Sequence, residues 1–120
     1  MFQIDHVSVL VADAEVSRDF YQSLLGCDLQ PRPDLGFPGY WLDLGEGCSI
    51  HLMQLDNPYQ GANKPEHGGR DMHFALRVPS LAPYQQVLDK QKMAYRVSLS
   101  GRQAMFLRDP DGNTLELVVK

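Results

Sequence analysis

Three histidines and one glutamate stand at matching places of an internal repeat in this 120-residue chain. His6 and His73 each begin a strand-like run, and they lie 67 residues apart. His51 and Glu116 lie inside a second pair of similar runs, 65 residues apart. The four runs read HVSVLV, HFALRV, SIHLM and TLELV. Because imidazole and carboxylate groups suit Zn, Ni, Co, Mn or Fe(II), the repeat predicts a divalent metal site built from these four side chains.

Alternation along the predicted strands turns these four side chains away from the helix-packing face. Successive residues of a strand point to opposite faces. In the first run the valines at 7, 9 and 11 share the face suited to packing against helices, so His6 points the other way. The same pattern holds for His51, His73 and Glu116. A lone histidine of this kind is more often a satisfied core residue, but four equivalent positions without cysteine favour a catalytic metal site.

Each half of the chain repeats the order strand, helix and two or three further strands. The first module covers about residues 1–56 and the second about 72–120. Residues 57–71 are rich in Gly, Pro and Asn, a composition typical of a linker. The repeat therefore predicts an α+β fold made of two similar modules.

One helix is predicted in each module. The first covers 15–25 and ends at Gly26, with Asp13 as its N-cap. The second covers 81–90, with Ser80 as its N-cap. The apolar stripes that should face the core are Val16, Phe20, Leu24 and Leu25 in the first helix, and Leu81, Tyr84, Val87 and Leu88 in the second.

Two hairpins close the two modules. The first covers 40–54 and turns at 45–47, and the second covers 105–119 and turns at 110–113, where Asp-Gly is a strong hairpin signal. Short additional strands are predicted near 29–32 and 95–99.

Composition excludes several classes of function. Apolar residues make up 43% of the chain and charged residues 22%, as in a globular protein. The net charge is −4 and no segment concentrates Lys or Arg, which argues against a nucleic-acid surface. No apolar stretch has the length of a membrane span, and the start lacks a basic region typical of a signal peptide. Cys27 and Cys48 are isolated, so the expectation is a cytoplasmic protein with free thiols.

The motifs DHVSVLVAD, DFYQSLLG, MHFALRV and FLRDPDGNTLEL resemble those of the vicinal oxygen chelate superfamily, which includes glyoxalase I, extradiol dioxygenases and bleomycin resistance proteins. The resemblance covers residues 1–120 as a single glyoxalase-like domain. It implies paired βαβββ modules, a curled sheet around a divalent metal, and a homodimer. His6, His73 and Glu116 fall on the usual ligand positions and His51 on the fourth, more variable one. In the dimer, the first-module and second-module ligands of one site would come from different subunits.

The resemblance also implies an activity on a small molecule. The leading prediction is glyoxalase I-like isomerase or lyase chemistry on an α-oxo or α-hydroxy substrate chelated to the metal, with Glu116 and His51 moving the proton. Whether His51 is a ligand or a base stays open. The alternatives are a fosfomycin-type thiol transferase or hydrolase, an Fe(II) extradiol dioxygenase, and a bleomycin-type binding protein without catalysis.

Further side chains are candidates for substrate contact. Arg77 follows His73 by four residues on the same face and could hold an anion or form a rim salt bridge. Arg102 follows Ser100-Gly101 in a loop that resembles family loops closing over substrate, but the favoured alternative is a solvated surface arginine. Of Tyr40 and Trp41, one should line the site and the other pack on a helix. His67, in the linker, could cover the metal from a loop, but it is expected to be an exposed loop residue.

Overall fold

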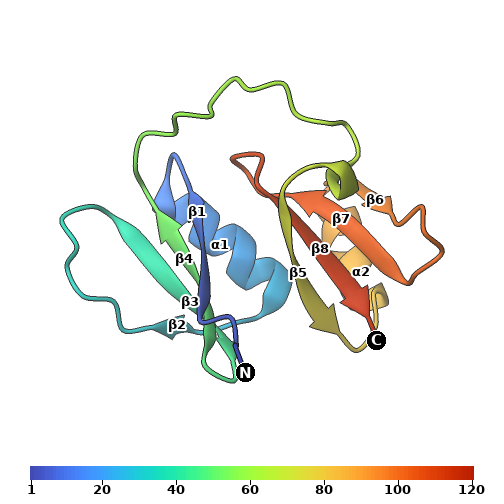
Figure 1. The fold of residues 1–120 in the computed structure, drawn as a ribbon, viewed down its shortest axis with the longest axis horizontal. Helices are drawn as coiled ribbons and strands as arrows, with labels where there is room; N and C mark the ends of the chain where they lie inside the picture. The colour runs from blue at the N-terminus through green and yellow to red at the C-terminus, as the bar shows by residue number, and fades with distance from the viewer. The chain divides into compact units, whose positions relative to one another are not determined.

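The computed structural model describes residues 1–120 as two compact units, Met1–Gln60 and Gly61–Lys120. Both units follow the order strand, helix and three strands, as Figure 1 shows. The elements of the first unit are β1 (His6–Leu10), α1 (Ala14–Leu25), β2 (Leu29–Gln30), β3 (Gly39–Gly45) and β4 (Cys48–Met53). Those of the second are the short 3-10 turn η1 (Gly68–Arg70), β5 (His73–Val78), α2 (Ala82–Lys90), β6 (Tyr95–Val97), β7 (Ala104–Arg108) and β8 (Thr114–Val119).

The two sheets share one topology. The strand order is β1-β4-β3-β2 in the first unit and β5-β8-β7-β6 in the second. In each, the first and last strands pair in parallel, and the remaining pairs are antiparallel. Ser8 pairs with His51 in the first sheet, just as Ala75 pairs with Glu116 in the second. The α+β fold of repeated βαβββ units is thereby confirmed.

Turn chemistry explains both hairpins. In the first, Glu46 and Gly47 connect β3 to β4 and both have positive φ, 52° and 77°, as a two-residue hairpin turn requires. In the second, the buried Asp109 carboxylate accepts hydrogen bonds from the backbone amides of Asp111 and Asn113 and from the Asn113 side chain. A carboxylate that satisfies three donors stabilises this longer turn.

Helix α1 begins and ends where the sequence predicts, but its buried face is different. Asp13 accepts hydrogen bonds from the amides of Glu15 and Val16, and Gly26 ends the helix with φ 65°. The prediction that Val16 faces the core is wrong, because it is 51% exposed. The residues that α1 buries are Ala14, Ser17, Phe20, Tyr21 and Leu24. The small Ser17 is fully buried in this stripe, and because it is polar, the hydrophobic pattern pointed to its neighbour.

Helix α2 begins without a side-chain cap. Its N-cap is Leu81, whose carbonyl accepts from the amides of Tyr84 and Gln85, so the predicted role of Ser80 is wrong. Ser80 stands one residue too early, because the first hydrogen bonds of the helix are accepted by the Leu81 carbonyl and no side chain caps them. Only Leu88 of the predicted stripe is fully buried.

The core of each unit lies between its sheet and its helix. In the view of Figure 1, α1 lies behind the first sheet and α2 behind the second. Leu42, Ile50 and Leu52 are fully buried in the first unit, and Met105, Leu115 and Leu117 in the second. Ile50 and Leu115 directly precede His51 and Glu116 on their strands, so alternation turns the two polar side chains to the opposite face.

No helix of the chain combines the length and apolar character needed to span a membrane. Both cysteines are free thiols.

Asp13, which caps α1, and Ser80, which precedes α2 without capping it, make a matched pair for mutation. Asp13→Ala should lower the free energy of unfolding by about 1 kcal/mol, because the amides of Glu15 and Val16 lose their acceptor. Ser80→Ala should change it by less than about 0.5 kcal/mol, as is usual for an exposed site without such a bond. Urea denaturation of the two variants measures both changes, and equal losses would contradict the assignment of the caps.

Candidate functional site

The second unit brings two of the predicted ligands together. His73 is the first residue of β5, and Glu116 lies on β8, the strand that pairs with β5 in parallel. The His73 Nε2 atom lies 3.3 Å from the Glu116 Oε1 atom. Glu116 is only 3% exposed, which is unusual for a carboxylate. These two side chains are the pair of predicted ligands that the second unit brings into direct contact.

The hydrogen bond of His73 Nδ1 determines which ring nitrogen of His73 has a free lone pair. The Nδ1 atom lies 2.8 Å from the backbone carbonyl oxygen of Asp71, which can only accept. In a neutral ring Nδ1 therefore carries the proton, and Nε2 directs its lone pair at the Glu116 carboxylate. Metal-bound histidines commonly hold their second nitrogen in this way. Two ligands about 2.1 Å from one ion lie about 3.0–3.4 Å apart in octahedral or tetrahedral geometry, so the observed separation fits a shared cation.

Arg108 holds the segment that orients His73. Its Nη1 atom donates to Asp71 Oδ2 at 2.7 Å, to Thr114 Oγ1 at 2.7 Å and to the Gly112 carbonyl at 3.0 Å. The hydrogen bond from Arg108 lowers the pKa of the Asp71 carboxyl below its ordinary value. Asp71 thereby connects Arg108 to the His73 ring through its own carbonyl. Sequence reasoning missed Arg108, and its position directly before the DPDGN turn was the available signal.

Arg102 lies on the other oxygen of the same carboxylate. Its Nη2 atom is 3.4 Å from Glu116 Oε2, and its Nε donates to Ser100 Oγ at 3.1 Å. The structure therefore brings this predicted substrate residue to the candidate site. Arg77 shares the strand face of His73 and is exposed.

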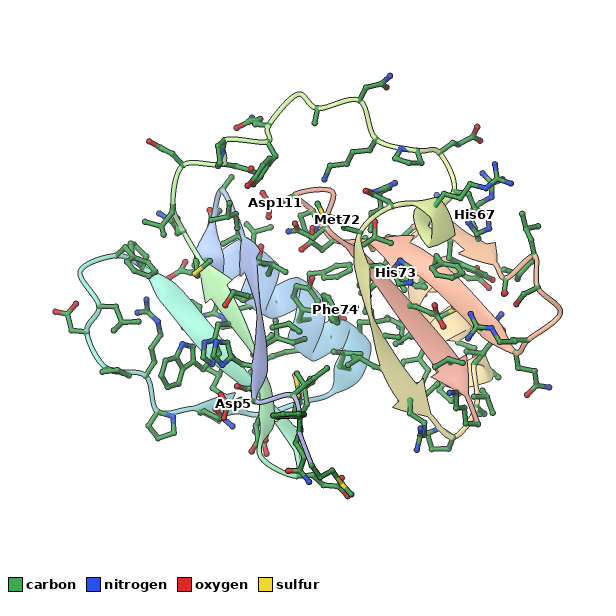
Figure 2. The ribbon with its side chains drawn as sticks, in the orientation of Figure 1. Asp5, His67, Met72, His73, Phe74 and Asp111 are labelled. Atoms are coloured by element: carbon green, nitrogen blue, oxygen red, sulfur yellow. The ribbon has the colours of Figure 1, made fainter.

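The linker histidine is part of this region. His67 accepts from the Gly69 amide through Nδ1, and its Nε2 lies 3.2 Å from the Val97 carbonyl. The Phe106 ring has edge contacts with both His67 and His73, at 5.3 and 5.2 Å between centroids. Figure 2 shows His67 at the η1 turn and His73 at the start of β5. The prediction of an exposed loop residue is wrong, because His67 is half-buried and caps η1.

The first unit arranges its ligand candidates as a stack of rings. The His6 and His51 rings are 4.0 Å apart and inclined by 8°, and the Trp41 ring lies 4.2 Å from His51, inclined by 7°. Trp41 pairs with His51 across β3 and β4, as Phe106 pairs with Glu116 across β7 and β8. Trp41 is therefore on the face of the histidines.

Tyr40 points to the opposite side of β3. Its hydroxyl accepts from Arg18 of α1 at 3.0 Å, and the same guanidinium lies 4.8 Å from the ring centroid. The expected division between Tyr40 and Trp41 is present, and the structure separates Tyr40 from the face of His6 and His51.

The stack limits how the first unit could bind a metal. A ligand imidazole presents its lone pair in the plane of its ring, so two parallel rings 4.0 Å apart cannot direct both lone pairs at one ion. His6 has its Nδ1 2.7 Å from Asp5 Oδ2, and His51 has its Nε2 3.0 Å from Ser49 Oγ. In this conformation at most one of the two serves as a ligand, and chelation by both requires one ring to turn.

His51 favours its neutral form. Burial is the main cause that lowers the pKa of His51, and the charge of protonated His6 lowers it further. A neutral imidazole is able to accept a proton.

Within residues 1–120, no three His, Cys, Asp or Glu side chains gather at one point. The structure thus supplies the pair His73 and Glu116 and the pair His6 and His51, each within one unit.

Comparison with known proteins gives the family. The model of the Glyoxalase/Bleomycin resistance protein/Dioxygenase superfamily matches residues 3–117. The chain belongs to this superfamily. The resemblance noted in the four motifs is confirmed.

Two curated proteins are similar to this chain over most of its length. Glyoxylase I 4 of Arabidopsis thaliana is 32% identical over 120 residues, covering 95% of this chain and 68% of that protein. Mitochondrial methylmalonyl-CoA epimerase of Bos taurus is 25% identical over 119 residues, covering 91% and 68%.

Solved structures share the glyoxalase fold. A glyoxylase/bleomycin resistance protein/dioxygenase domain from Frankia sp. EAN1pec has a TM-score of 0.75 at 24% identity, covering 99% of this chain and 98% of that one. The fosfomycin resistance protein FosX of Mesorhizobium loti has a TM-score of 0.74 at 14% identity, covering 98% and 91%. These likenesses support the fold alone.

The pKa of His51 is open to direct measurement. In the metal-free protein, an NMR pH titration should show the His51 ring protonating below the ordinary value of about 6.5. His6→Gln should move that midpoint upward, because a neighbouring positive charge is removed. His67→Asn should leave it unchanged, since His67 is not among the groups that shift it.

The same shift has a consequence for stability. A histidine whose folded pKa is lowered is protonated first in the unfolded chain, so its contribution is lost as the pH falls below about 6.5. His51→Gln should therefore lose less stability between about pH 7 and pH 5.5 than the wild type. A steeper loss in the variant would contradict the direction of the shift.

Proposed function

We propose that this protein is a metal-dependent enzyme that isomerises or cleaves a small α-oxo or α-hydroxy compound held through two adjacent oxygens. The observation that carries the proposal is the 3.3 Å contact between His73 Nε2 and the buried Glu116 carboxylate, with Nδ1 engaged by the Asp71 carbonyl. The lone pair of His73 Nε2 and the Glu116 carboxylate oxygen face each other, and these are two ligand atoms that one divalent cation binds.

The donor set suits Ni, Zn, Co, Mn or Fe(II). When bound, such an ion acts as a Lewis acid on the two substrate oxygens. His73 and Glu116 hold it from the second unit. In a homodimer, His6 or His51 of a second copy would supply a further ligand, and the use of both would require one ring to turn out of the stack.

The chain's own residues would move the proton. Glu116 exposes little surface and accepts a proton from the carbon next to the chelated oxygen, or returns it. His51, held neutral, does the same from the first-unit side. Trp41 offers a flat apolar surface beside it.

The names of the relatives favour proton transfer over the other chemistries. One relative is named as a glyoxylase, and another as an epimerase, which inverts a carbon centre. Inversion at carbon takes removal and return of a proton, which is work for two opposed bases. Glu116 and His51 are suited to that task.

Metal binding is the first test. The untagged protein, purified without chelators, should contain close to one divalent ion per chain, measured by elemental analysis after dialysis. His73→Ala should lose most of it, because both the nitrogen ligand and the orientation of the pair with Glu116 are removed. The matched control is His67→Asn, because Asn retains an N-cap acceptor for η1 and the position lies outside the ligand set.

Two results would contradict the proposal. A wild-type protein that neither contains metal nor takes up Ni, Zn, Co, Mn or Fe(II) would point to a binding protein without catalysis. Equal metal loss in His73→Ala and His67→Asn would mean that the site lies elsewhere.

Complementation tests whether two subunits share each site. One chain carries His6→Ala and His51→Ala, and the other carries His73→Ala and Glu116→Gln. Each alone should bind no metal, but a mixed dimer recovers one intact site if first-unit and second-unit ligands come from different chains. A random mixture should then hold about one-quarter of the wild-type metal. No recovery in mixed dimers isolated with two different tags would contradict the shared site.

A further inference from the structure

We propose that Arg102 binds an anionic group of the substrate, and that it is held on Glu116 until a metal ion takes that carboxylate. This inference rests on the proposed function and specifies its substrate class: a compound with two adjacent oxygens and, beside them, a carboxylate or phosphate.

The Glu116 carboxylate has one partner on each of its two oxygens. One carboxylate oxygen faces His73 Nε2 at 3.3 Å, and the other faces Arg102 Nη2 at 3.4 Å. The Glu116 side chain is 5% exposed, whereas that of Arg102 is 51% exposed. A buried carboxylate needs a positive partner, and here an exposed guanidinium supplies it from the rim.

A divalent ion on His73 and Glu116 changes this balance. It neutralises the carboxylate and repels the guanidinium, so the ion and Arg102 compete for one anion. The Arg102 contact at 3.4 Å is longer than a strong charge-assisted hydrogen bond, so it is the weaker partner. Arg102 should therefore leave Glu116 when the metal binds.

The released guanidinium stays beside the site. Its Nε atom donates to Ser100 Oγ, and Ser100 Oγ lies 2.8 Å from Ser98 Oγ, so the base of the group is anchored in the loop. Its two outer nitrogens are then available to an anion next to the metal. Guanidinium binds carboxylate and phosphate through two parallel hydrogen bonds.

The other arginines of this unit that make ion pairs have different partners. Arg96 donates to Glu66 at 2.9 Å, and Arg108 is held by Asp71 at 2.7 Å. Neither contacts a predicted metal ligand. Arg102 alone among these three has a partner that the metal would take away.

The first experiment measures metal affinity. Arg102→Gln should bind Zn²⁺ roughly threefold to tenfold more tightly than the wild type in competition with a chromogenic chelator, because the competing cation is gone. Arg96→Gln is the matched control, since it removes the same charge from a side chain that is 50% exposed and paired with Glu66. Its affinity for Zn²⁺ should stay within about twofold of the wild type.

The second experiment measures anion preference. Acetohydroxamate chelates a metal through two adjacent oxygens, and malonomonohydroxamate adds one carboxylate to it. Calorimetry on the Zn²⁺-loaded wild type should show tighter binding of the carboxylated probe, by about tenfold. Arg102→Gln should lose that preference, Arg102→Lys should retain part of it, and Arg96→Gln should retain all of it.

The outcomes separate the two proposals. A wild type that takes up none of Zn, Ni, Co, Mn or Fe(II) overturns both the proposed function and this inference, and if another of these ions binds in place of Zn²⁺, both experiments use that ion. Wild-type binding with unchanged or weaker Zn²⁺ affinity in Arg102→Gln overturns only the inference, as does an anion preference that survives this substitution. Tighter metal binding together with a lost preference for the carboxylated probe is the expected result, because a residue that merely supported the loop would weaken both.

Discussion

Parallel pairing of the first and last strands within each unit is the constraint on which the site depends. It places β1 beside β4 and β5 beside β8 in the same register. His6 therefore comes to lie beside His51, and His73 beside Glu116, although 45 and 43 residues of chain separate the members of each pair. The buried apolar face of each sheet holds this register, since a slip by one residue would turn the whole apolar set outward.

The two units use the same frame for different chemistry. In the first, the position across from His51 holds Trp41, and three flat rings stack. In the second, Glu116 replaces the imidazole, and this buried carboxylate faces His73 Nε2 from the strand and the Arg102 guanidinium from the loop. At equivalent positions of the two sheets, His51 is therefore part of a stack of rings, whereas Glu116 forms a pair with His73 that is suited to a cation.

Prediction from sequence succeeded where the cause was local. Asp13 caps α1, Gly26 ends it and Glu46-Gly47 turns the first hairpin, because each depends on a few neighbouring residues. It failed at Val16 and Ser80. Which stripe of α1 is buried depends on the sheet it packs against. The N-cap of α2 lies one residue after the predicted cap, because the Leu81 carbonyl accepts the first hydrogen bonds of the helix. The role of Arg108 was not predicted, because its hydrogen-bond acceptors Asp71, Gly112 and Pro65 lie apart in the sequence.

The sequence by itself determined the repeat, the strand faces of His6, His51, His73 and Glu116, and the family to which these motifs belong. Only the tertiary structure decided which atoms meet: that the Asp71 carbonyl turns His73 Nε2 toward Glu116, that Arg102 holds the second carboxylate oxygen, and that His51 lies between two rings. The physical reason is the distance along the chain over which each interaction acts. Alternation and turn chemistry act within a few residues, whereas a ring's orientation is determined by hydrogen bonds and packing from strands distant in the chain.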